Sequence, residues 1–160
     1  MPKKYLLLTL LTLQLSLSAC ATKLTANVNE SQDMDDLGQI FVAHFEPDGR
    51  DIHKIIAEEF NALGYNATYG ETEEKPKNAD TVVTYADRWM WDMTMYMLAI
   101  DITLFDVNKG LPIADVHNMR TSLVRKTPRG MVRGALYELL GKDTPPEDVV
   151  KTEEHGQLQN

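Results

Sequence analysis

Residues 81–107 read TVVTYADRWMWDMTMYMLAIDITLFDV and are the most β-prone part of the chain. β-Branched and aromatic residues dominate this stretch, as they do in half-buried strands of a pleated sheet. The pattern predicts one strand over residues 81–91, a bend at residues 92–94, and a second strand over residues 96–107. Every other residue of the second strand is expected to face the core. That core face comprises Tyr96, Leu98, Ile100, Ile102 and Leu104.

The segment after this hairpin predicts one more strand and an amphipathic helix. Residues 108–110, Asn-Lys-Gly, form a typical hairpin turn because the glycine readily adopts a positive φ. We expect the returning strand over residues 112–123. Thr127 followed by Pro128 is typical of a helix start, with a capping hydroxyl before a proline in the first helical position. The helix would end at Gly141 and bury one stripe, made of Met131, Val132, Ala135, Leu136, Leu139 and Leu140.

The segment before the hairpin predicts a strand–helix–strand unit. Residues 39–46 carry apolar residues at both parities, which is typical of an inner strand covered on both faces. Asp51 is expected to cap the following helix, and Gly64 to end it with a positive φ. The apolar face of that helix comprises Ile52, Ile55, Ile56, Phe60 and Leu63. A short strand is expected over residues 65–69, followed by a charged loop over residues 71–79.

Together these elements predict an α+β domain over residues 37–141. Their order is β-α-β-β-β-β-α, in which the first crossover is long enough for parallel pairing and the later connections read as antiparallel hairpins. Two amphipathic helices can then cover one face of a mainly antiparallel sheet, which gives a two-layer sandwich. Residues 142–160 contain adjacent prolines and several acidic residues, and we predict a disordered acidic tail there.

The first 20 residues have the layout of a secreted precursor. Lys3 and Lys4 precede an apolar run over residues 5–15, which is too short for a membrane-spanning helix. Residues 17–20 then read Leu-Ser-Ala-Cys, an aliphatic residue and two small residues before a cysteine. This pattern matches the lipobox at which bacterial lipoprotein precursors are cleaved. The element order of the remaining chain is also similar to that of small periplasmic and outer-membrane lipoproteins.

The resemblance to bacterial lipoproteins implies a processing route and a location. Residues 1–19 would be the signal peptide, and acyl chains would be attached to the thiol and the new amino group of Cys20. Cys20 is the sole cysteine, so no disulfide can compete for it. Ala21, in the position where an aspartate tends to retain lipoproteins at the inner membrane, implies the periplasmic face of the outer membrane. An ordinary secretory signal peptide with a chance cysteine is the alternative interpretation.

Residues 20–36 and the overall charge set limits on membrane contact. The residues after the cysteine are polar with isolated apolar residues, so we expect an acylated cysteine followed by a flexible tether. Loss of residues 1–19 removes two lysines and no acid, and the net charge of −8 becomes about −10. Such an acidic chain is unsuited to nucleic acid or anionic lipid, because both need a basic surface. Stable membrane attachment would therefore depend on the acyl chains.

The sequence contains little that is typical of an enzyme. It contains no Gly-x-Ser-x-Gly, phosphate-binding glycine loop or His-Glu-x-x-His motif. Four aspartates on the predicted hairpin could form an acid–base pair, but they read as strand-end and solvent-facing residues: Asp87, Asp92, Asp101 and Asp106. The four histidines show no short ligand spacing and predict no zinc site: His44, His53, His117 and His155. We predict no catalytic activity and no cofactor.

Residues 89–97, WMWDMTMYM, are the unusual stretch, since they hold both tryptophans and four of the eight methionines. Three interpretations remain open: core filling, an adaptable protein-binding surface, and soft thioether ligands for Cu(I). The partner-binding candidates are Trp89, Trp91, Met93, Met95 and Met97. The alternative Cu(I) ligands are Met93, Met95, Met97 and His117. Our main hypothesis is a lipid-anchored binding or scaffold module that contacts an envelope protein or forms a homodimer, and metal handling is the alternative.

Overall fold

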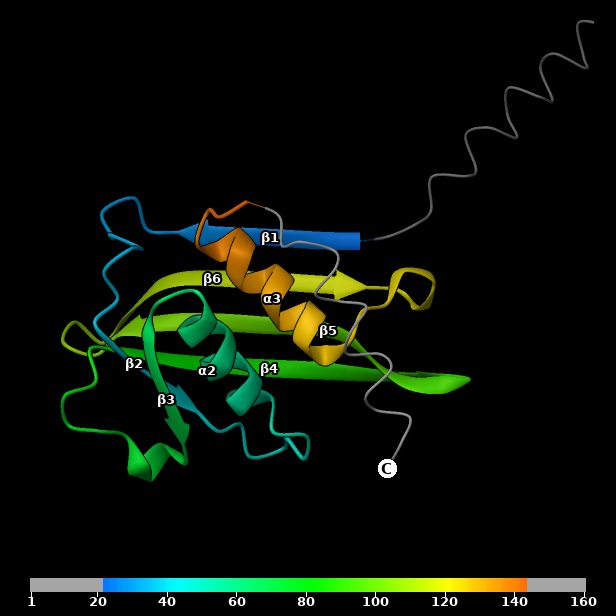
Figure 1. Cartoon of the computed structure of the whole chain (residues 1–160), viewed down its shortest axis with the longest axis horizontal. Coiled ribbons are helices and arrows are strands. Elements are labelled where there is room, and N and C mark those ends of the chain that lie inside the picture. Colours follow the sequence, from blue (N-terminus) through cyan, green and yellow to red (C-terminus); the bar gives the residue numbers. More distant parts are fainter. Residues whose placement is uncertain (1–21, 144–160) are drawn as a thin grey trace, which may run out of the picture.

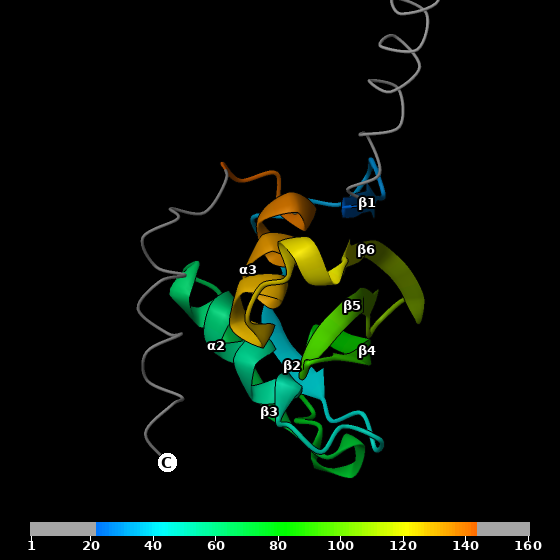
Figure 2. The ribbon, with the colours of Figure 1, turned by 90° about the vertical axis from the view of Figure 1, so that its right-hand side faces the viewer.

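The computed structural model describes residues 22–143, which form one six-stranded mixed sheet with two helices packed on one of its faces (Figure 1; Figure 2). The order of the strands across the sheet is β1-β6-β5-β4-β2-β3. The strands are β1 (Thr22–Val28), β2 (Gln39–Ala43), β3 (Asn66–Gly70), β4 (Thr81–Asp92), β5 (Thr94–Asp106) and β6 (Leu111–Arg120). The helices are α2 (Ile52–Ala62) and α3 (Pro128–Leu139), with short 3₁₀ turns η1 (Thr72–Glu74) and η2 (Ser122–Val124). The predicted α+β two-layer architecture is confirmed.

The predicted signal peptide and Cys20 lie outside the described residues, as does the predicted tail from residue 144 onward. Neither helix of the described part is long and apolar enough to cross a membrane.

The long hairpin predicted over residues 81–107 forms the centre of the sheet. β4 pairs with β5 and β5 with β6, both antiparallel. β2 pairs in parallel with β3 through the α2 crossover, as expected. The expected antiparallel connection from β3 to β4 is wrong. The chain passes from β3 through residues 71–80 to the far side of β2, where β4 pairs in parallel with it.

The expected flexible tether over residues 20–36 is wrong for Thr22–Val28, which form edge strand β1. β1 pairs antiparallel with β6, with Thr22 opposite Arg120. Leu24 and Ala26 pack partly buried against the core. The polar sequence of residues 22–28 did not indicate a strand. Main-chain hydrogen bonds to β6 hold this strand in place, and only its alternate residues need to be apolar. β1 therefore extends the domain toward the N-terminus as far as Thr22, and the element order of the described residues becomes β-β-α-β-β-β-β-α.

The start of α2 differs from the expectation, whereas the start of α3 agrees with it. Asp51 adopts a left-handed conformation with φ 58°, and its side chain caps no N–H in the described part of the chain. Asp48 replaces it, since its carboxylate accepts hydrogen bonds from the N–H groups of Ile52 at 2.6 Å and Arg50 at 2.7 Å. In α3 the Thr127 hydroxyl accepts the N–H of Gly130 at 3.1 Å, as the sequence predicted.

A β-bulge changes the core face of β5. Arg88 pairs with Ala99 and Trp89 with Met97, which leaves Leu98 as the extra residue on β5. Since a bulge reverses the alternation of faces, the core positions are Met97, Ile100, Ile102 and Leu104, all fully buried. Leu98, which the strict alternation placed in the core, is only partly buried. Met97 is therefore a core residue and not an exposed contact.

Candidate functional site

The end of the β4–β5 hairpin exposes a cluster of large apolar side chains. Four residues there, which we call the hairpin tip, are Met90, Trp91, Met93 and Met95. Trp91 is 69% exposed and Met93 85% exposed. Trp91 is opposite Met95 in the β4–β5 register, beside the turn that holds Met93, whereas Met90 alternates to the other face of the hairpin. Single exposed apolar residues are common on protein surfaces, but several at one hairpin end are typical of a contact site. Leu123 of η2 is also exposed, and the neighbouring Arg125 donates a hydrogen bond to the Thr94 hydroxyl at 3.0 Å.

The backbone at the hairpin tip is itself unfavourable for folding. Met93 lies at the turn between β4 and β5 with φ 59°. Glycine or asparagine would adopt this conformation at lower cost than methionine, whose Cβ is crowded there. A bulky, solvent-exposed side chain at such a position contributes nothing evident to the packing of the domain. Conformational strain of this kind is concentrated at functional positions.

The hairpin tip lies at the same end of the sheet as the start of β1. Thr22 pairs with Arg120 at the C-terminal end of β6, which is the end that leads into η2. Figure 1 shows the first residues of β1, η2 and the far end of the β4–β5 hairpin together at the right-hand side. The chain upstream of Thr22, where Cys20 would be acylated, therefore enters the domain at its apolar end.

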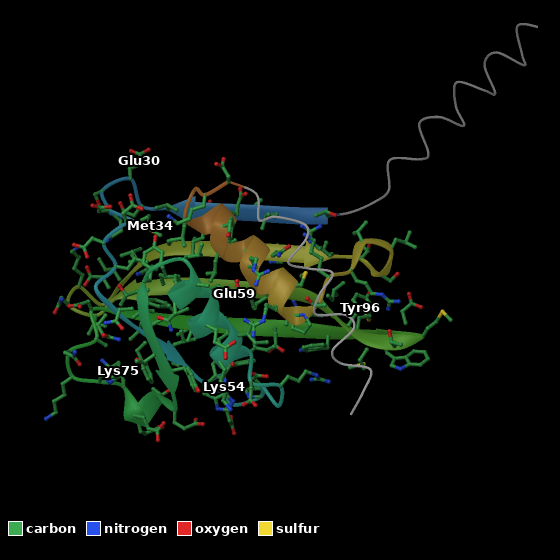
Figure 3. All side chains as sticks on the ribbon, viewed as in Figure 1. Glu30, Met34, Lys54, Glu59, Lys75 and Tyr96 are labelled. Carbon is green, nitrogen blue, oxygen red and sulfur yellow. The ribbon has the colours of Figure 1, made fainter. Side chains whose placement is uncertain are left out.

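A cleft of about 560 Å³ lies between the base of the hairpin tip and the start of α3. Trp89 lines it and is half-buried rather than exposed. The Arg50 guanidinium carbon lies 4.1 Å from the centroid of the Trp89 ring, and the indole N–H donates to the carboxylate of Asp87. Arg125 lies 5.9 Å from the ring centroid of Tyr96, which Figure 3 labels near the hairpin end. Trp89 is thus held by the domain's own residues, whereas Trp91 is free to contact a partner.

The proposed Cu(I) ligands are not brought together. The Met97 side chain is fully buried in the core, whereas Met93 points into solvent from the turn. His117 is opposite Asp101 in the β5–β6 register and pairs with its carboxylate. Asp101 lies four residues along β5 from Met97, about 13 Å at the rise of an extended strand. This geometry gives no support to a thioether site.

Three of the four hairpin aspartates have structural partners: Asp87, Asp101 and Asp106. Asp87 accepts the indole N–H of Trp89. Asp101 pairs with Arg88 at 3.3 Å as well as with His117. Asp106 pairs with Lys109 at 2.9 Å and also accepts main-chain N–H groups of the β5–β6 turn. These contacts stabilise the strands and turns, so the aspartates do not form a carboxylate pair suited to acid–base catalysis.

The structure does assemble one polar cluster that the sequence analysis missed. His44, Asp48 and His53, which we call the histidine corner, present ligand atoms within 4.8 Å of one another. Their spacing, His-x3-Asp-x4-His, spans the strand–turn–helix connection from β2 to α2. It was overlooked because the three residues belong to different elements, and the sequence does not show how the turn folds back.

Asp48 is the fixed centre of the histidine corner. The Tyr85 hydroxyl donates to its carboxylate at 2.6 Å, in addition to the two main-chain N–H groups. Burial alone would raise the pKa of Asp48, but the hydrogen bonds from Tyr85, Arg50 and Ile52 outweigh it and hold that pKa below its usual range. Burial, together with the same hydrogen bond to Asp48, raises the pKa of Tyr85. Asp48 is therefore an ionised carboxylate that accepts from a neutral phenol at neutral pH.

The described fold is similar to that of PelC from Paraburkholderia phytofirmans. A PelC dodecamer structure matches with a TM-score of 0.55 and 14% sequence identity, over 78% of this chain and 100% of that chain. A second PelC dodecamer structure, of a single-substitution variant, matches with the same TM-score and coverage at 17% identity. No protein-family model matches the sequence, and a search of curated proteins finds no match. At this level of identity the likeness shows the fold alone.

Proposed function

We propose that this protein is a lipid-anchored scaffold at the periplasmic face of the outer membrane, and that it assembles with copies of itself through the hairpin tip. The observation that carries the proposal is the exposed Trp91–Met93–Met95 cluster at the end of the domain where the chain enters. Methionine and aromatic side chains suit such a surface because they adapt to a partner and bury a large area. Binding, not catalysis, is the activity for which this geometry is suited.

The position of β1 supports a close and oriented attachment. Only Ala21 separates the proposed acylation site from Thr22, the first residue of β1. Two residue steps reach at most about 7 Å in a fully extended chain. The acyl chains would therefore hold the apolar end of the sheet near the bilayer surface. Anchored copies would share one orientation in one plane, which raises their effective concentration for side-by-side contacts.

The similarity to PelC supports self-assembly as the mode of binding. The similar PelC structures are dodecamers, so this fold can form a homo-oligomer. Symmetric assemblies repeat one contact many times, and a modest apolar patch on each copy then suffices. We therefore favour a second copy of this chain as the occupant of the hairpin tip.

Trp91→Ala is expected to weaken self-association tens-fold. Truncation of an aromatic residue at the centre of an interface often costs about 2 kcal/mol or more. The measurement is chemical crosslinking in the envelope, together with sedimentation of the detergent-solubilised full chain over a range of concentrations. Leu111→Ala is the matched control, since Leu111 is 60% exposed and lies beside the turn at the opposite end of the sheet. Equal association of the two variants would overturn the role of the hairpin tip.

Cys20→Ser is expected to abolish acylation and membrane retention, because the chain has no other thiol. The measurement is metabolic labelling with a palmitate analogue, followed by fractionation into membrane and soluble pools. The wild-type chain should incorporate label and sediment with outer membranes, and the variant should do neither. A variant that still carries label would show that the lipobox interpretation is wrong.

A further inference from the structure

The histidine corner shares no residue with the hairpin tip, and a scaffold role does not account for it. His44 follows directly after β2, Asp48 lies in the turn, and His53 is the second residue of α2. The β2–α2 connection thus brings two imidazoles and one carboxylate together at the carboxyl end of β2. Two histidines and a carboxylate are a common ligand set for transition metals in proteins.

His53 carries the clearest sign of an absent ligand. Its side chain is 8% exposed, and its Nδ1 atom is buried with no hydrogen-bond partner among the described residues. The nearest carboxylate oxygen, on Asp48, lies 3.7 Å away, which is too far for a hydrogen bond. Buried polar nitrogens are almost always paired, so an unpaired one directed at a carboxylate calls for a ligand.

Asp48 caps the start of α2 and is also oriented so that it can act as a metal ligand. Its side chain is fully buried, and the N–H of Ile52, the N–H of Arg50 and the Tyr85 hydroxyl fix its orientation. Oδ2 accepts the N–H of Ile52 and the Tyr85 hydroxyl, whereas Oδ1 accepts only the N–H of Arg50, so one lone pair of Oδ1 remains for a cation. Outer hydrogen bonds of this kind commonly orient carboxylate ligands in metal sites.

His44 completes the set and gives access from solvent. Its ring centroid lies 4.6 Å from that of His53. Its Nδ1 pairs with the carboxylate of Glu71 at 2.9 Å, and its Nε2 contacts the main-chain carbonyl oxygen of Asp48 at 3.0 Å. A carboxylate on one ring nitrogen is the usual support of a metal-bound histidine, whose other nitrogen binds the ion. The His44 side chain is 19% exposed, so an ion can approach from this side.

We propose that His44, Asp48 and His53 bind a divalent transition-metal ion of the zinc class, with Nδ1 of His53 and the Asp48 carboxylate as the first two ligands. His44 supplies the third ligand by exchanging its contact with the Asp48 carbonyl for one with the ion, and water fills the fourth position. Tetrahedral ligands about 2.0–2.1 Å from zinc lie roughly 3.3 Å apart. The ligand atoms here lie within 4.8 Å of one another, so closure needs a small shift of the partly exposed His44 ring. Imidazole ligands disfavour calcium and magnesium, which prefer oxygen.

The test is a titration of the metal-free, detergent-solubilised full chain with zinc chloride against a fluorescent chelator. We expect one ion per chain with micromolar or tighter affinity. His53→Gln should weaken binding by more than about 100-fold, since loss of an outer partner alone costs about 10–100-fold. The matched control is the double variant His117→Gln/His155→Gln, which removes the two other histidines and should bind as the wild type does. Equal affinity of wild type and His53→Gln, or wild-type binding weaker than micromolar, would overturn the proposal.

Two further measurements keep the test decisive if His53→Gln folds poorly. Glu71→Gln alters an exposed side chain outside the ligand set, and it should weaken zinc binding about 10–100-fold while leaving the fold unchanged. Zinc should also raise the Tm of the wild-type chain, because an ion that binds only the folded state stabilises it. A wild-type Tm that does not respond to zinc, with Glu71→Gln indistinguishable in affinity, would exclude the site.

Discussion

Glu59→Ala is expected to lower the free energy of unfolding by about 3–5 kcal/mol. Glu59 lies on α2, 2% exposed, and Figure 3 labels it where α2 meets α3. Its carboxylate accepts two hydrogen bonds from Arg133, at 2.7 and 2.9 Å, and one from Arg129 at 2.9 Å. The variant would leave the guanidinium of Arg133, whose side chain is 12% exposed, without this carboxylate in the helix interface.

The measurement is urea denaturation followed by circular dichroism. Glu58→Ala is the matched control, because Glu58 also pairs with Arg129 but its side chain is 56% exposed. Exposed ion pairs contribute about 0–1 kcal/mol, so the control should unfold at nearly the wild-type midpoint. Similar midpoints for the two variants would mean that solvent reaches Arg133 and that the helix interface is looser than the structure shows.

Local sequence signals predicted much of this fold. The hairpin over residues 81–107 follows from strand propensity, and the Asn-Lys-Gly turn places Gly110 at φ 65°. Thr127 and Pro128 fix the start of α3, because the capping hydroxyl and the proline act within one turn of the chain. Such elements could be predicted because the residues that cause them are adjacent in sequence.

The features that were missed depend on contacts between different elements of the fold. β1 is held by β6, and its polar sequence does not indicate a strand by itself. The bulge at Leu98 could not be read from β5 alone, since it is defined by the register against β4. The histidine corner forms because Asp48 folds back onto the start of α2 and meets Tyr85 of β4. Each case requires a tertiary contact that overrides the local pattern.

Met97→Ala is expected to lower the free energy of unfolding by about 2–5 kcal/mol, as large-to-small substitutions of buried residues do. The sequence pattern grouped Met97 with Met93 and Met95 on one surface. The bulge at Leu98 turns the face that carries both Met95 and Met97 toward the core side. Met97 lies nearer the centre of the sheet, where it is fully buried and belongs to the cluster that includes Ile100 and Ile102, whereas Met95 lies at the exposed hairpin end. A cavity at this position would weaken the contact between β5 and α3, which packs on it.

Met95→Ala is the matched control for this prediction, because Met95 is two residues away on the same strand and 50% exposed. Urea midpoints should separate the two variants clearly, with Met95→Ala close to wild type. Self-association should show the opposite order, since Met95 belongs to the hairpin tip and Met97 does not. If Met97→Ala unfolded at the wild-type midpoint and lost association, β5 would have no bulge at Leu98 and all three methionines would share the partner surface. The stability and association measurements together therefore test both the register of β5 and the limits of the proposed contact surface.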